Sequence, residues 1–164
     1  MAKGQPAIDA SRIAVVGNSK GGELGLLLGA TYPEDIEVVV GYVPSGIVWQ
    51  AITFDREAYH GGPRSPWSLR GEPVPFVGPA RPAIPEAALM SGLFFGGIPI
   101  IGRTFYERAL DDEEAAVAAA SIAVEKIDAP VMVISGTDDQ LWPSTRFSEM
   151  VIKRLKAHNH PLSS

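Results

Sequence analysis

The stretch RIAVVGNSKG, residues 12–21, decides the fold of this chain. Its first half, Arg12 to Val16, is a short β-branched run that stops at Gly17, which is typical of a central parallel strand buried on both faces. After the glycine-rich turn, apolar residues recur at helical spacing until Tyr32-Pro33, a natural helix stop, at Leu24, Leu27 and Leu28. The sequence therefore predicts a strand, a tight turn and a helix.

Further strands and helices follow the same alternation. A second β-branched run from Ile36 to Val43 completes a βαβ unit, which implies parallel pairing and a right-handed crossover. Later segments predict a helix over 105–120, a third buried strand over 130–135 and an amphipathic helix over 144–158. The fold class is therefore α/β, with a mostly parallel sheet and flanking helices.

A long excursion, residues 44–103, interrupts this alternation. It holds more than half of the chain's 14 prolines, interleaved with glycine and aromatic residues. Such long irregular segments in compact domains are usually functional or disordered, and the apolar content here argues against disorder. We expect it to fold over one end of the sheet.

Composition excludes several classes of protein. The 164 residues suit a single domain, and a net charge of −5 without a block of like charge argues against a nucleic-acid partner. The absence of cysteine removes disulfides, thiolate metal sites and a cysteine nucleophile. The N-terminus shows no apolar signal region, so we expect a cytoplasmic location, and the uncharged stretch 87–102 is too short to span a membrane.

The turn at residues 17–21 has the pattern G-x-S-x-G between a predicted strand and a predicted helix. In a nucleophile elbow, a strained turn raises a serine hydroxyl above the sheet, and side chains two residues to either side would collide. That geometry predicts glycine at 17 and 21, with Ser19 as nucleophile. The backbone amide of Lys20 would open the helix and point toward a developing oxyanion.

This turn has three other interpretations. A dinucleotide-binding fingerprint needs glycine at the position of Ser19, and a phosphate-binding P-loop needs a different spacing before its lysine. Neither pattern fits. A glycine-rich turn with an incidental serine is the structural alternative, which the placement between strand and helix disfavours.

Acidic residues follow the third predicted strand, at Asp138 and Asp139. A carboxylate there lies at the same edge of a parallel sheet as the elbow, where α/β active sites gather, although a turn aspartate is the commoner explanation. A serine–histidine–aspartate triad also needs an imidazole. Where a serine nucleophile follows a strand in this way, the triad residues come in the chain order serine, aspartate, histidine, and His60 precedes the aspartate. His158 and His160 come after it, but they are typical of solvated residues at a helix C-terminus.

Taken together, these segments resemble a known family: the C-terminal catalytic domain shared by acyl-CoA thioesterases and bile-acid-CoA:amino-acid N-acyltransferases, which is related to dienelactone hydrolases. The resemblance covers nearly the whole chain in order. It rests on residues 17–24, 43–49, 65–76, 124–127, 130–144 and 154–158.

The resemblance implies the α/β-hydrolase fold and the roles of several residues. It maps the nucleophile onto Ser19 and the triad aspartate onto Asp139, because Gly136, Asp139 and Pro143 match the spacing of related hydrolases. Asp138 would then be structural, capping the turn. Trp49 and Trp67 fall in segments that the family keeps near the site, and pocket lining and core packing remain equal alternatives.

The resemblance also implies that strands preceding residue 12 and a histidine-bearing strand following residue 164 are absent. We therefore expect residues 1–164 to be a single partial α/β-hydrolase domain, a fragment or a truncated product. For the complete domain, the expected activity is hydrolysis of an acyl-CoA thioester through an acyl-enzyme, with no cofactor. Residues 1–164 alone are expected to be inactive, because the catalytic histidine is missing from them.

Three alternatives to that activity stay open: acyl transfer to an amino acid, hydrolysis of esters or lactones, and a non-catalytic decoy. The expected partner is a small acyl thioester or ester, with neither a nucleic acid nor a membrane. Self-association through an exposed sheet edge at Arg12 to Val16 is also expected.

Overall fold

The computed structural model describes residues 4–9, 11–51, 62–78 and 102–160. These residues belong to two compact units. The first comprises Met1–Gly46, Ile122–Thr137 and Ser144–Ser164, and the second Ile47–Ser121 and Asp138–Pro143. His60 and much of the excursion predicted over 44–103 lie outside the described residues.

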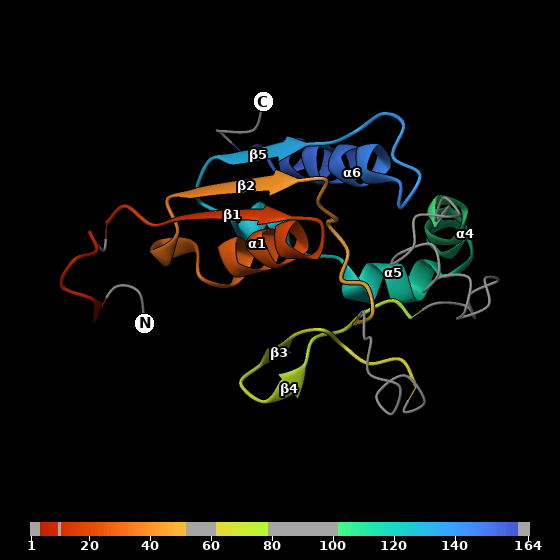
Figure 1. Cartoon of the computed structure of the whole chain (residues 1–164), viewed down its shortest axis with the longest axis horizontal. Coiled ribbons are helices and arrows are strands. Elements are labelled where there is room, and N and C mark those ends of the chain that lie inside the picture. Colours follow the sequence, from red (N-terminus) through yellow and green to blue (C-terminus); the bar gives the residue numbers. More distant parts are fainter. Residues whose placement is uncertain (1–3, 10, 52–61, 79–101, 161–164) are drawn as a thin grey trace, which may run out of the picture. The chain divides into compact units, whose positions relative to one another are not determined.

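A three-stranded parallel sheet organises the first unit, in the order β1-β2-β5 (Figure 1). Its strands are β1 (Ala14–Asn18), β2 (Val38–Tyr42) and β5 (Val131–Ile134), so every predicted strand is present. Strands β2 and β5 are slightly shorter than predicted, whereas β1 begins two residues later and continues through Gly17 to Asn18. Helix α1 (Lys20–Thr31) and a 3-10 turn, η2 (Pro33–Asp35), connect β1 to β2. The predicted α/β class and the parallel βαβ unit are confirmed.

Helix α1 packs on the sheet through glycines. Its buried residues are Gly22, Glu23, Gly25, Leu26 and Gly29, whereas Leu24, Leu27 and Leu28 are only half-buried. A methyl group at Gly29 would lie 2.8 Å from a Val39 methyl carbon, and one at Gly25 would lie 3.3 Å from a Val15 methyl carbon. The predicted helix is confirmed, but the leucine spacing did not identify the face that packs, because close approach to the sheet favours small residues over apolar ones.

The opposite sheet face is apolar and exposed within this unit. Val16, Val40 and Met132 stand in register across the three strands, and Val16 is 65% and Met132 55% exposed. The expectation of a central strand buried on both faces is therefore wrong for the described residues: β1 is an edge strand, and only the face toward α1 is covered.

Helix α6 (Ser144–Ala157) completes the first unit and buries Phe147, Val151 and Leu155. It begins beside the end of β5, where the Thr145 hydroxyl donates to the Gly136 carbonyl at 3.0 Å. Its last turns lie near the amino ends of the strands, where Arg154 donates two hydrogen bonds to Glu125 of η3 (Val124–Lys126). The helix predicted over 144–158 is confirmed.

The second unit contains a short hairpin, β3 (Ser68–Leu69) and β4 (Glu72–Pro73). Its two turn residues, Arg70 and Gly71, both have positive φ, as a type I′ turn requires. Two isolated bridges, Ile47 with Ser121 and Trp49 with Val77, tie distant parts of the unit together. The excursion is therefore not wholly irregular.

Two helices, α4 (Arg103–Asp112) and α5 (Glu114–Ala120), replace the single helix predicted over 105–120. The chain leaves helical geometry at Glu113, where φ is −117° and ψ is 45°. Four consecutive acidic residues cause this division, because carboxylates are unfavourable at a helix C-terminus and favourable in a new first turn. No helix among the described residues is long and apolar enough to cross a membrane.

Candidate active site

Ser19 occupies a strained turn between β1 and α1. Its φ of 54° and ψ of −119° lie outside the regions open to most residues with side chains. Two backbone hydrogen bonds hold it: its N–H donates to the Tyr42 carbonyl at 2.9 Å, and its carbonyl accepts from the Glu23 N–H at 3.0 Å. The Ser19 hydroxyl does not cap the helix.

The glycines around Ser19 have unequal importance. A methyl group at Gly17 would lie 2.0 Å from the carbonyl oxygen of Gly21, so position 17 has no room for a side chain. At Gly21 such a group would meet nothing within 4 Å. The expectation that both positions exclude side chains is therefore correct for Gly17 and wrong for Gly21, because Gly21 contributes its backbone to the crowding.

A second strained residue follows the neighbouring strand. Val43, directly after β2, has a φ of 42°, and its N–H donates to the Ile134 carbonyl at 2.6 Å. A β-branched residue rarely adopts positive φ, so the surrounding structure must enforce it. Ser19 and Val43 follow adjacent parallel strands and lie at the same edge of the sheet. Val43 falls in a segment on which the family resemblance rests, but sequence reasoning did not predict its strained conformation, since valine has no preference for such a turn.

An ion pair lies in the first turn of α1. Lys20 Nζ is 2.6 Å from Glu23 Oε1, and the Glu23 side chain is fully buried. Burial lowers the pKa of Lys20, and the charge and hydrogen bond of Glu23 oppose that shift. The sequence analysis missed Glu23, although a lysine three residues before it is a signal for such a pair.

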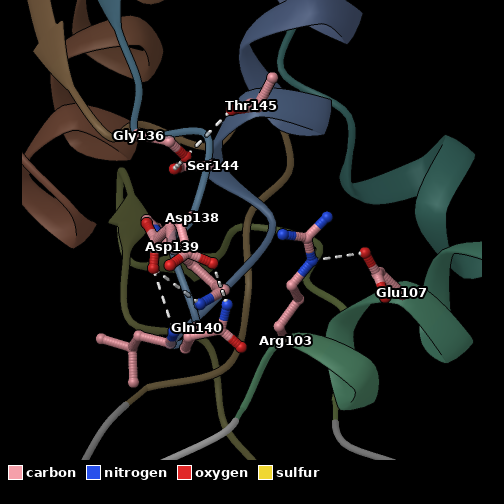
Figure 2. Close-up of polar contacts among 10 residues, drawn as sticks. Arg103, Glu107, Gly136, Asp138, Asp139, Gln140, Ser144 and Thr145 are labelled. Atoms are coloured by element: carbon pink, nitrogen blue, oxygen red, sulfur yellow. Dashed lines mark hydrogen bonds and ion pairs between the residues drawn. The ribbon is translucent and has the colours of Figure 1, made fainter.

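Asp139 lies in the second unit, in the loop that follows β5 (Figure 2). Its Oδ1 accepts hydrogen bonds from the backbone N–H groups of Leu141 at 3.0 Å and Trp142 at 3.3 Å. Asp138 instead accepts a hydrogen bond from the Gln140 side chain at 2.5 Å. Asp139 therefore caps the turn, the role that the sequence analysis gave to Asp138.

Arg103 is the cation beside this loop. Its backbone N–H donates to the Gln140 carbonyl, and its side chain donates to Glu107 at 2.8 Å (Figure 2). The hydrogen bond to Glu107 raises the pKa of Arg103, with smaller contributions from Asp138 and Asp139. Sequence reasoning gave no role to Arg103.

The histidines within the described residues lie away from Ser19. His160 Nε2 is 2.9 Å from the Ile127 carbonyl, which precedes β5, and His158 is exposed beside it at the end of α6. Because the strands are parallel, Ser19 after β1 lies at the carboxyl edge of the sheet and His160 at the amino edge. The third histidine, His60, lies outside the described residues.

The two candidate pocket tryptophans differ in burial. Trp49 is buried and packs edge-on against Tyr106, with ring centroids 4.8 Å apart, and Tyr106 packs likewise on Trp142 at 5.9 Å. Trp67 is half-buried, and its backbone N–H donates to the Ser65 hydroxyl. Trp49 thus belongs to an aromatic cluster within the second unit. Among the described residues, no group of acidic or histidine side chains could hold a metal ion.

A parallel sheet with flanking helices and a strained serine turn at its carboxyl edge defines the class of this protein: it has part of an α/β-hydrolase fold. The family model described as BAAT / acyl-CoA thioester hydrolase C terminal matches residues 2–164, and the chain belongs to this family. No curated protein matches the chain significantly. The family as a whole indicates acyl-CoA thioesterase or acyltransferase chemistry.

Proposed function

We propose that this chain carries two members of the catalytic triad of an acyl-CoA thioester hydrolase: Ser19 as the nucleophile and Asp139 as the carboxylate that orients the imidazole. The observation that supports this most strongly is the positive φ of Ser19, directly between strand and helix. A strained conformation costs about 1–3 kcal/mol and persists where the surrounding structure enforces it, most often at functional sites. Gly17, which has no room for a side chain, is what permits the turn.

In the proposed reaction, the Ser19 hydroxyl oxygen attacks the thioester carbonyl carbon, and its proton passes to an imidazole base. The carbonyl oxygen becomes an oxyanion, which the Lys20 backbone N–H stabilises; this N–H belongs to the first helical turn, whose N–H groups have no acceptor within the helix. Collapse breaks the C–S bond and releases the thiol of CoA, protonated by the imidazolium. Water then hydrolyses the acyl-enzyme.

Asp139 is the proposed partner of the imidazole. Its Oδ1 is held by two backbone N–H groups, and its Oδ2 accepts no hydrogen bond among the described residues. A carboxylate fixed through one oxygen can orient an imidazole N–H through the other. His158 and His160 are not the proposed base, since their helix ends at the opposite edge of the sheet from Ser19.

Labelling with a fluorophosphonate, which phosphonylates activated serines, tests the nucleophile. Mass spectrometry should locate the label on Ser19, and Ser19→Ala should abolish it without loss of the fold. Ser45 and Ser135 are internal controls in the same unit. A label on either of them in place of Ser19 would contradict the assignment.

The acyl acceptor is tested separately, because the family description includes both hydrolysis and acyl transfer. The protein is incubated with an acyl-CoA, with and without glycine, and the products are identified by mass spectrometry. Free acid in both reactions supports the proposed hydrolase. Formation of N-acylglycine would identify an acyltransferase instead.

A further inference from the structure

Glu23 is a carboxylate placed where carboxylates are rarely found. Its side chain is fully buried in the first turn of α1, four residues after Ser19. Burying a charge is unfavourable unless it is paired, so a buried glutamate requires a compensating group. Lys20 provides one, with Nζ 2.6 Å from Glu23 Oε1, and the positive end of the helix dipole adds to it. We call these two side chains the elbow ion pair.

The elbow ion pair is attached directly to the strained turn. Lys20 is the residue after Ser19, and the Glu23 N–H donates to the Ser19 carbonyl at 3.0 Å. The first turn of α1 is therefore closed twice, once through the backbone and once through the Lys20 and Glu23 side chains. Beside it, a methyl group at Gly22 would lie 3.0 Å from the Pro44 Cβ, so this turn is packed tightly against the segment after β2.

We propose that the elbow ion pair positions the active serine: Lys20 and Glu23 hold Ser19 in its strained conformation and fix the direction of the Lys20 backbone N–H. Lys20 and Glu23 are thus positioning residues. Their catalytic consequence rests on the proposed function of Ser19, whereas their effect on the turn does not. Without the side-chain closure, the positive φ of Ser19 would relax, because strain persists only where several contacts enforce it.

Charge gives the pair a second effect on the same site. The ion pair is neutral overall, so it does not oppose the negative charge that develops near the Lys20 N–H. A buried glutamate that has lost the lysine charge would oppose it, with an interaction strengthened by exclusion of water. Removing Lys20 alone should consequently be more harmful than removing both charges.

Amide hydrogen exchange of the full chain, followed by NMR, tests the proposal. Lys20→Met should raise the exchange rates of the Ser19 and Glu23 amides by about tenfold or more relative to those of Val39 and Val40 in β2. Lys20→Arg, which keeps the charge, should restore slow exchange. The double variant Lys20→Met/Glu23→Gln should recover part of the slow exchange. If Lys20→Met does not fold, the double variant is measured in its place.

Arg154→Met is the matched control, since it breaks another ion pair of the same unit at the opposite edge of the sheet. It should accelerate exchange near Glu125 and leave the ratio of Ser19 to Val39 unchanged. If Lys20→Met raises exchange equally at Ser19 and in β2, the pair stabilises the fold in general and the positioning role is overturned.

Fluorophosphonate labelling links the turn to chemistry. The rate of Ser19 labelling should fall about tenfold in Lys20→Met and return in Lys20→Arg, in step with the exchange data. Altered exchange with an unchanged labelling rate would overturn the positioning role. An unlabelled Ser19 in the unaltered protein would refute the proposed function, and amide exchange alone would then decide whether the elbow ion pair holds the turn.

Discussion

An alanine methyl group at position 17 would lie 2.0 Å from the carbonyl oxygen of Gly21, far inside the contact distance of two atoms. The chain therefore returns almost onto itself between the end of β1 and the start of α1. The oxygen belongs to the backbone and the methyl carbon is bonded directly to the Cα of residue 17, so neither atom could move aside without moving the chain. This backbone contact, rather than a side-chain interaction, sets how sharply the chain turns at Ser19.

Gly17→Ala should consequently disrupt the turn, whereas Gly21→Ala should be tolerated. We expect Gly17→Ala to destabilise the fold by about 3 kcal/mol, because the clash involves backbone atoms. Gly21→Ala should stabilise it by about 0.5–1 kcal/mol, since Gly21 lies within a helix with open space around it. Urea unfolding followed by circular dichroism measures both. Equal losses would show that the turn differs from the one described.

In a protein that includes the imidazole base, Asp139→Asn should lower thioester turnover far more than Asp138→Asn. The asparagine oxygen can still accept the hydrogen bonds from Leu141 and Trp142, so the turn should persist while the charge that orients an imidazole is lost. A loss of several powers of ten is typical of triad members. Steady-state rates with an acyl-CoA, together with thermal melting of each variant, separate the two effects. The reverse ranking would assign the acid to Asp138.

The exposed apolar sheet face predicts self-association of residues 1–164. Val16, Tyr42, Met132 and Ile134 present apolar surface on it, and β1 and β5 are the outer strands of the sheet that the described residues form. Val16→Lys/Met132→Lys should shift the protein toward monomer in sedimentation velocity experiments. Leu141→Lys, at an exposed residue of the other unit, is the control and should change nothing. An unaltered protein that is monomeric at all concentrations would contradict this prediction.

Acid should weaken the first unit through Glu125. The hydrogen bonds from Arg154 hold the pKa of Glu125 below its ordinary value of 4.5. Because the folded pKa is the lower one, the stabilisation is complete above about pH 4.5 and is lost as the pH falls through the folded value.

Glu125→Gln should therefore cost about 0.5–1 kcal/mol near neutral pH and progressively less in acid, the size being limited by the partial exposure of Arg154. Glu149→Gln, which removes an exposed carboxylate from α6, is the control. Urea unfolding between pH 3 and pH 7 measures the difference. A cost that stays constant over this range would show that Arg154 does not stabilise the ionised form.

Most of the sheet was predictable because its signals are local. The β-branched runs and the glycine-rich turn after Val16 determine the strands, the helix and their parallel order without knowledge of distant contacts. Two features depend on packing and escaped prediction. The face of α1 that meets the sheet is set by the close approach of Gly29 to Val39. The break at Glu113 lies within a run of acidic residues, which oppose the end of one helix and favour the start of the next.

The candidate site was predictable only in part. The position of Ser19 in the turn and the need for glycine at position 17 follow from the G-x-S-x-G spacing, because crowding within such a short turn is a local property of the chain. The burial of Glu23 does not, since a glutamate in a first helical turn is ordinarily solvated. The choice between Asp138 and Asp139 as turn cap depends on which carboxylate meets the N–H groups of Leu141 and Trp142, a geometry that spacing alone does not specify.

The glycine face of α1 has a consequence for how this protein can vary. A helix that meets the sheet through Gly25 and Gly29, and the segment after β2 through Gly22, leaves little room for added carbon atoms: a methyl group would lie 3.0 Å from Pro44 at Gly22, 3.3 Å from Val15 at Gly25 and 2.8 Å from Val39 at Gly29. The half-buried Leu24, Leu27 and Leu28 carry no such restriction. A saturation mutagenesis map of this helix should therefore invert the usual pattern, with Gly22, Gly25 and Gly29 intolerant of substitution and Leu24, Leu27 and Leu28 exchangeable for other apolar residues.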